Sequence, residues 1–221
     1  MKGFKKTNIG QGIDLYVLPT DKFKTVSISY CFHRDLDEYY TYNALIPAVM
    51  RRGCQGYETL RDMERHLESQ YGAIFDVGVQ KKGERHLLRF SMDIVNDNYI
   101  PHDDTAVVAQ AFHFLNRVIT KPVLEDGVFK SEYVEQEKQN LKNRIEALIN
   151  DKMAYSAERC LQIMCENEKY RRYVYGDVQE LDQIDSAALY GVYREILETS
   201  PLDIFVVGDV ENLDIEQILN N

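Results

Sequence analysis

The 221-residue sequence predicts an α+β fold in which an antiparallel sheet is flanked by helices. Two observations predict it. Short runs rich in Val, Ile, Tyr and Phe occur near both ends and in the middle of the chain, and the segments between them repeat apolar residues at helical spacing. The expected order is β-β-α-α-β-β-α-α-α-α-β-α, with no internal repeat and no low-complexity linker.

The first two predicted strands flank a turn signal. Residues 13–18 and 24–32 lie on either side of Pro19-Thr20-Asp21, and we expect them to pair as a hairpin. In the second run, Val26-Ser27-Ile28-Ser29-Tyr30 alternates apolar and small polar residues. This alternation predicts that one face of the sheet is buried and the other is more exposed.

Two helices are expected next. Residues 44–50 are apolar and end at Arg51-Arg52-Gly53, a cationic last turn followed by a glycine. Residues 57–71 carry apolar side chains at helical spacing and end at Gly72. The remaining predicted elements are antiparallel strands at 73–79 and 85–95, helices at 105–119, 129–148, 154–166 and 186–198, a strand at 202–210 and a helical tail at 211–219.

Composition excludes several classes of function. A net charge of -10 and a pI near 5.0 oppose binding to nucleic acid, because the protein's field repels phosphate. No apolar run approaches the roughly 20 residues of a membrane span, and the N-terminus lacks the apolar segment of a signal peptide. The four cysteines show no C-x-x-C spacing, which indicates reduced thiols. We therefore expect a cytoplasmic protein.

No metal or cofactor site is expected. None of the five histidines lies four residues from another. His102-Asp103-Asp104 could ligate a divalent ion, but acidic residues at a helix start also suit the helix dipole, and we favour that interpretation. Cys160 and Cys165 are spaced to point to different faces of a helix, and no glycine-rich nucleotide loop is present.

Four short segments, in their order along the chain, carry a family resemblance. They are Arg52-Gly53-Cys54, Leu67-Glu68-Ser69-Gln70-Tyr71-Gly72-Ala73, Glu135-Gln136-Glu137-Lys138 and Val206-Val207-Gly208-Asp209-Val210. Over essentially all 221 residues the chain resembles the insulinase, pitrilysin and mitochondrial processing peptidase family. This resemblance implies a metallohydrolase-like domain, residues 1–221, that forms half of a longer two-domain chain.

A closer similarity is to small bacterial insulinase-like proteins associated with the aminopentanol modification of elongation factor P. It is carried by Tyr71-Gly72-Ala73, Asn150-Asp151-Lys152 and Met164-Cys165-Glu166.

The resemblance implies that the zinc site is lost. The family has H-x-x-E-H on its first helix, where two histidines bind zinc and the glutamate activates water. The equivalent positions here are Ala44, Pro47 and Ala48, and the third ligand, a glutamate on a later helix, corresponds to Arg144. We therefore expect a non-catalytic member. Because proline disrupts a helix interior, we also expect the first helix to begin near Pro47 or to be kinked there.

The family binds extended substrate by adding it to a sheet edge. The resemblance places this edge at 73–79 and implies that the peptide-binding residues are Ala73, Phe75, Asp76, Val77 and Val79. Phe75 and Asp76 are expected nearest to the lost metal site.

Three functional hypotheses remain open. In the first, the chain forms the chamber wall and peptide-binding surface of an assembly with a related zinc-bearing subunit. In the second, it is a peptidase with a rearranged metal site. In the third, it is a structural scaffold of the core-protein type. The segment Tyr170-Arg171-Arg172-Tyr173-Val174-Tyr175 is either an interaction surface or partly buried support.

Overall fold

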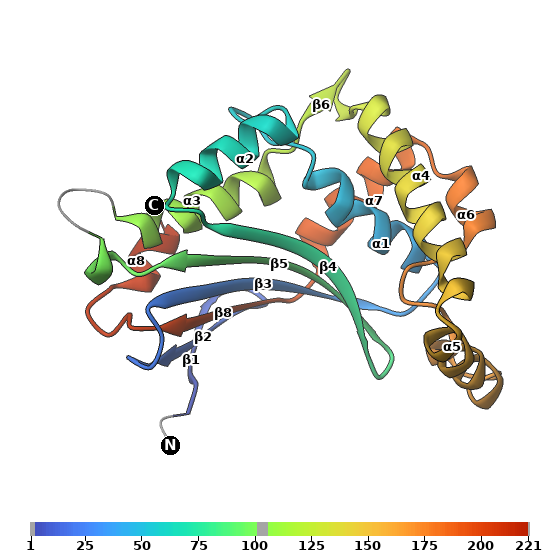
Figure 1. The fold of residues 1–221 in the computed structure, drawn as a ribbon, viewed down its shortest axis with the longest axis horizontal. Coiled ribbons are helices and arrows are strands. Elements are labelled where there is room, and N and C mark those ends of the chain that lie inside the picture. Colours follow the sequence, from blue (N-terminus) through green and yellow to red (C-terminus); the bar gives the residue numbers. More distant parts are fainter. Residues whose placement is uncertain (1–2, 101–105, 221) are drawn as a thin grey trace.

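The computed structural model describes residues 3–100 and 106–220, which form one sheet covered on one face by helices (Figure 1). The described strands of this sheet follow the order β1-β2-β8-β3-β5-β4. Their bounds are β1 Lys5–Gly10, β2 Ile13–Pro19, β8 Leu202–Gly208, β3 Thr25–Asp35, β5 Arg85–Val95 and β4 Ile74–Lys82. The predicted α+β class is confirmed.

The predicted hairpin between residues 13–18 and 24–32 is wrong. Strand β8 lies between β2 and β3, running parallel to β2 and antiparallel to β3. Thr20, just after β2, donates a backbone hydrogen bond to the Gly208 carbonyl at the end of β8 (2.9 Å), so the segment that follows β2 passes the end of the inserted strand before β3 begins. A partner almost 200 residues away leaves no signal in a local turn pattern. β2 instead forms its hairpin with β1, a strand that the sequence did not predict.

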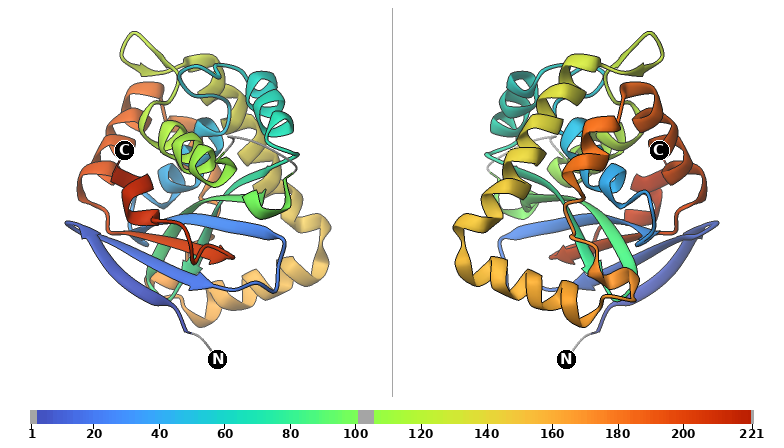
Figure 2. Two further views of the ribbon diagram at one scale, coloured as in Figure 1. Left: turned by 90° about the vertical axis from the view of Figure 1, so that its left-hand side faces the viewer. Right: turned by 90° about the vertical axis from the view of Figure 1, so that its right-hand side faces the viewer.

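Helices α1 (Tyr40–Met50), α2 (Leu60–Ser69), α3 (Val107–Thr120), α4 (Ser131–Ala147) and α7 (Ser186–Thr199) form the covering layer (Figures 1 and 2). The expectation that α1 begins near Pro47 is wrong, since the helix starts a full two turns earlier. Pro47 lies inside it, and the Arg51 backbone donates a hydrogen bond to the Pro47 carbonyl (3.0 Å). Burial on several sides compensates for the missing donor.

The shorter elements connect this layer. They are η1 (Asp97–Tyr99), β6 (Leu124–Glu125), β7 (Val128–Phe129), η2 (Leu148–Asn150), α5 (Lys152–Met164), η3 (Lys169–Arg171), α6 (Val178–Gln183) and α8 (Ile215–Asn220). The predicted tail helix at 211–219 thus forms only from Ile215 onward.

The core lies between the sheet and the helices. Ile28, Phe90 and Met92 of the sheet and Phe112 of α3 are fully buried, as the alternating pattern of β3 predicts. Burial of such side chains contributes about 1.5–3 kcal/mol each to folding. In the described part of the chain, no helix is both long enough and apolar enough to cross a bilayer.

Candidate functional site

The positions that the resemblance assigns to the zinc ligands lie on α1 and α4, two helices that are in contact. At one end of this pair, Arg52 contacts Glu137 at 3.4 Å. At the other end, Tyr40 of α1 and Glu146 of α4 line the same cavity. The two helices are therefore antiparallel, and counting along both from the Arg52–Glu137 contact places Arg144 at the level of Ala44.

Ala44 and Ala48 share one face of α1, as residues four apart do. Ala44 is only 6% exposed, and Ala48 is half-buried. An alanine side chain has no atom that can bind a metal ion, so neither position can supply the imidazole that a zinc site of this family requires.

Arg144 is held by a tyrosine. Its guanidinium carbon lies 3.8 Å from the centre of the Tyr175 ring, and its Nη2 donates a hydrogen bond to Tyr175 Oη (2.6 Å). A cation stacked on an aromatic ring therefore occupies the position that the resemblance assigns to the third ligand, a carboxylate in the family. This donor set of two methyl groups and a guanidinium does not fit a zinc ion.

No group of three or more His, Cys, Asp or Glu side chains is placed to hold a metal ion among residues 3–100 and 106–220. The candidate His102-Asp103-Asp104 lies outside the described residues.

Segment 172–177, between η3 and α6, packs tightly on the start of α1. Gly176 has φ +95°, and a Cβ there would lie 2.8 Å from Thr41 Cγ2. Thr41 accepts a hydrogen bond from the Asp177 backbone (3.1 Å) and donates one to Glu180 (2.6 Å). Sequence reasoning identified the segment 170–175 only by its Tyr and Arg content, and the structure uses it as partly buried support for α1.

A buried histidine fastens the same segment to the sheet. His86 of β5 is fully buried, and its Nε2 lies 3.1 Å from the Val174 carbonyl oxygen, which can only accept. Desolvation by burial lowers the pKa of His86 to about 4. The imidazole is therefore neutral in the folded protein near pH 7. No signal in the sequence marks this role.

The predicted peptide-binding strand forms β4, which is the outermost strand of the sheet on its side (Figure 1). Phe75 and Val79 point into the core, where the Phe75 ring packs edge-on against Phe114 at 5.4 Å. Asp76 is exposed and pairs with Arg89 at 2.9 Å.

Ala73 precedes the strand and is buried, and Val77 is half-buried. The side chains of Phe75 and Val79 are thus unavailable to a ligand, and only the β4 backbone and its exposed residues, such as Ile74, remain free to contact one.

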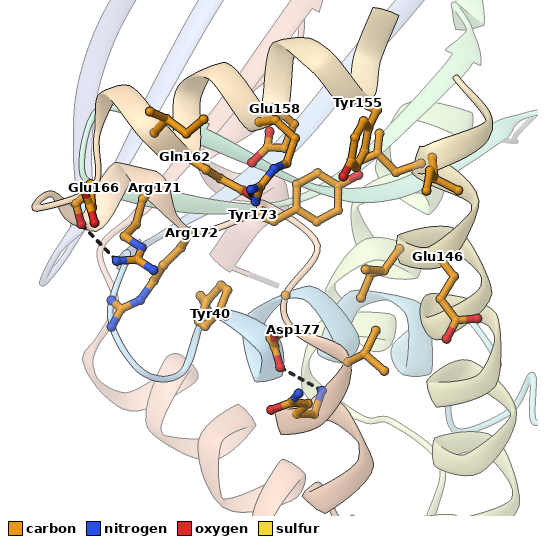
Figure 3. A pocket seen from close by; sticks show the side chains of 18 residues that line it. Tyr40, Glu146, Tyr155, Glu158, Gln162, Glu166, Arg171, Arg172, Tyr173 and Asp177 are labelled. Atoms are coloured by element: carbon orange, nitrogen blue, oxygen red, sulfur yellow. Dashed lines mark hydrogen bonds between the residues drawn. The ribbon is translucent and has the colours of Figure 1, made fainter. Parts of the chain in front are cut away.

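A cavity of about 900 Å³ lies next to the start of α1 and segment 172–177 (Figure 3). Its walls come from the start of α1, the end of α4, the helix α5 and segment 172–177. Lys81, near the end of β4, donates to the carbonyls of Tyr170 (3.0 Å) and Arg172 (2.7 Å), so β4 is fixed directly to one wall.

Comparisons with known proteins agree with this fold. No family model matches the sequence. A curated relative, however, is 34% identical over 210 residues, which are 95% of this chain. The chain belongs to the insulinase-type, or M16, peptidase family. The relative is the probable inactive metalloprotease YmfF of Bacillus subtilis (strain 168), and the match covers 49% of it.

Solved structures show the same fold. A conserved protein from Enterococcus faecalis V583 superposes with a TM-score of 0.92 and 32% identity, over 99% of this chain and 52% of that one. The inactive domain of an M16 peptidase from Pseudomonas fluorescens gives a TM-score of 0.76 at 15% identity, over 97% and 48% of the two chains. The chain spans about half the length of these relatives.

Replacing Gly176 by alanine tests the packing of segment 172–177. The new Cβ meets the Thr41 side chain as well as the cost of a left-handed backbone, so we expect a loss of about 2–4 kcal/mol in the free energy of unfolding. Gly127→Ala is the matched control, because Gly127 has φ +83° and nothing within 4 Å of the added carbon. It should lose only about 1 kcal/mol. Equal losses in urea denaturation would contradict the packing argument.

The buried His86 predicts a pH-dependent stability. Its folded pKa of about 4 lies below the unfolded value of 6.5, so the unfolded state binds more protons between these values and stability falls as the pH falls through this window. From pH 7 to pH 5 the unchanged protein should lose free energy of unfolding as His86 becomes protonated in the unfolded state. We expect this loss to be smaller by about 2 kcal/mol in the variant His86→Gln. Urea denaturation at both pH values measures it, and an unchanged pH dependence in the variant contradicts the assignment.

Restoring the family's motif should not restore a metal site. In the triple variant Ala44→His, Pro47→Glu and Ala48→His, the third position is still Arg144, whose charge repels a cation. We expect no stoichiometric zinc by metal analysis and no peptidase turnover. A quadruple variant that also carries Arg144→Glu is the comparison, because only this variant has two histidines and a glutamate that could bind zinc together. Zinc at one equivalent in the triple variant would contradict the role given to Arg144.

Proposed function

We propose that the chain is a non-catalytic half of an insulinase-type peptidase assembly that forms part of the chamber wall and presents peptide to a zinc-bearing partner. One observation supports the proposal: Ala44 is buried, Ala48 is half-buried and Arg144 is stacked on a ring, and the family resemblance assigns the three zinc ligands to these positions. The description of YmfF as a probable inactive metalloprotease supports the same conclusion.

Peptide binding is the retained part of the family's chemistry in this proposal. Strand β4 lies at the edge of the sheet, and its outward backbone groups are suited to pairing with an extended chain. Main-chain hydrogen bonds to an edge tolerate many sequences, which suits a chamber that handles varied peptides. The binding surface is the β4 backbone with Ile74 and Asp76, while Phe75 and Val79 act as core residues that keep the strand in place.

The proposed partner is a related subunit or domain with an intact H-x-x-E-H helix. One feature supports pairing: the chain matches about half of YmfF and about half of each solved structure described above. The association with elongation factor P modification, implied by the resemblance of the sequence, stays a prediction about the substrate.

Edge-strand binding is tested with a labelled twelve-residue extended peptide and a copy that is N-methylated at alternate residues. N-methylation removes the donors on one edge of the peptide and leaves its side chains unchanged. Since each lost hydrogen bond costs about 0.5–1.5 kcal/mol, we expect binding to weaken at least about tenfold. Equal affinities in fluorescence anisotropy would exclude pairing with the strand backbone.

The location is tested separately by photo-crosslinking. A benzoylphenylalanine at Ile74, which is 63% exposed on β4, should capture the peptide. Benzoylphenylalanine in place of the exposed Leu124, in the β6–β7 hairpin, is the control and should capture no peptide. Capture at Leu124 alone would place peptide binding elsewhere.

A further inference from the structure

Gly78, in the middle of edge strand β4, is a glycine that the fold does not explain. Its backbone is not left-handed, and a Cβ added to it would meet nothing within 4 Å. Gly176, in contrast, has both a left-handed backbone and a close neighbour. A glycine inside a strand lowers stability, and it commonly marks a place where a ligand or another backbone comes close. In an edge strand that is proposed to bind peptide, a side chain of the peptide is the natural occupant of this gap.

The turn that ends β4 decides which backbone groups of the strand are free. The loop between β4 and β5 has two residues, so Lys82 and Arg85 form the hydrogen-bonded pair beside it. Counting by twos from Lys82, Gly78 also directs its N–H and C=O toward β5. Val77 and Val79 direct theirs toward the free edge. A peptide that pairs with β4 therefore forms its hydrogen bonds with the residues on either side of Gly78.

The peptide residue opposite Gly78 belongs to a non-hydrogen-bonded pair. In antiparallel pairs of this kind the Cα atoms are about 4.5 Å apart and the side chains are close neighbours. Phe75 and Val79 of β4 enter the core. Asp76, Gly78 and Gln80 alternate with them and lie on the face opposite the helical layer (Figure 1). The peptide residue consequently places its side chain on that outer face, over a position where β4 has none.

Arg89 borders this gap from the next strand. It is directly opposite Gly78 in the β4–β5 ladder. Its guanidinium lies toward β4, where Nη2 donates a hydrogen bond to Asp76 (2.9 Å), and the side chain is 38% exposed. Its Nε is buried and has no hydrogen-bond partner in the described part of the chain. A flat and only partly satisfied cation therefore lies beside the gap, and the face of such a group stacks well on an aromatic ring.

We propose that the gap at Gly78 is an aromatic subsite, in which a Phe, Tyr or Trp side chain of a strand-paired peptide covers the glycine and lies against the Arg89 guanidinium. An aromatic residue opposite an edge glycine shields the open backbone, and here it also gains the face of a cation. An acidic side chain suits the gap less, because Asp76 already pairs with Arg89 and the protein carries a net charge of -10. The inference rests on the proposed function, whose class of peptide it names.

The test compares two labelled twelve-residue extended peptides that differ only in one central residue, which is Phe in one and Ala in the other. We expect the Phe peptide to bind at least about fivefold more tightly in fluorescence anisotropy. In the variant Gly78→Thr the two peptides should bind equally, because a side chain then fills the gap, while main-chain pairing keeps the affinity for the Ala peptide. Gln80→Thr is the matched control, since it places the same side chain at the next outward position of β4 and should retain the preference for Phe.

Three further measurements report on the subsite independently. Arg89→Lys keeps the positive charge but removes the flat group, so the preference for Phe should fall at least about twofold. A peptide with benzoylphenylalanine at its central position should crosslink to residues 76–80 or to Arg89, as located by mass spectrometry. Gly78→Thr should unfold at a urea concentration no lower than that of the unchanged protein, because threonine suits a strand better than glycine does.

The inference is overturned if the unchanged protein binds both peptides equally, if the preference for Phe survives in Gly78→Thr or Arg89→Lys, or if the crosslink forms elsewhere. It is also overturned if Gly78→Thr destabilises the fold, since the glycine would then have a structural role. Equal binding of the Phe and Ala peptides, with weaker binding of an N-methylated copy, removes the subsite and leaves the proposed function in place. Failure of both peptides to bind overturns the proposed function together with the subsite.

Discussion

The burial of α1 is the constraint on which the rest of the structure depends. This helix contacts β4 and β5 on one side and α4, α6 and α7 on others, so it is apolar almost all round. Its position explains how the chain tolerates Pro47, why Ala44 is shielded from solvent and why segment 172–177 must pack so closely on Thr41. A helix used in this way is part of the core, whereas a helix that holds a catalytic zinc must keep one face open.

Arginine side chains with aromatic or charged partners surround the positions that the resemblance assigns to the metal ligands. Arg144 stacks on Tyr175, Arg172 lies over the Tyr40 ring at 5.4 Å, and Arg52 pairs with Glu137. Each of these arginines therefore has an aromatic ring, a carbonyl or a carboxylate as its partner. The features on which the proposed peptide-binding role depends are geometric, namely the sheet edge at β4 and the cavity beside it.

The sequence predicted the elements that have a strong local pattern. The alternation in β3, the amphipathic α2 and the edge position of β4 all appear in the structure. The sequence pattern did not predict β1, because Lys5–Gly10 is a polar edge strand without alternation. It also predicted the wrong neighbour for β2, because the true neighbour, β8, lies at the far end of the chain. The burial of His86 depends on tertiary contacts, which no local sequence pattern encodes.

The most direct measurement of the central claim is the metal content of the unmodified protein together with its hydrolytic activity. The protein is purified in the presence of zinc, desalted and analysed by inductively coupled plasma mass spectrometry, and a quenched peptide substrate is added with and without a chelator. The account predicts zinc far below one equivalent and no hydrolysis above the chelated control. One equivalent of zinc with chelator-sensitive cleavage would show that a rearranged metal site exists and that the chain is a peptidase in its own right.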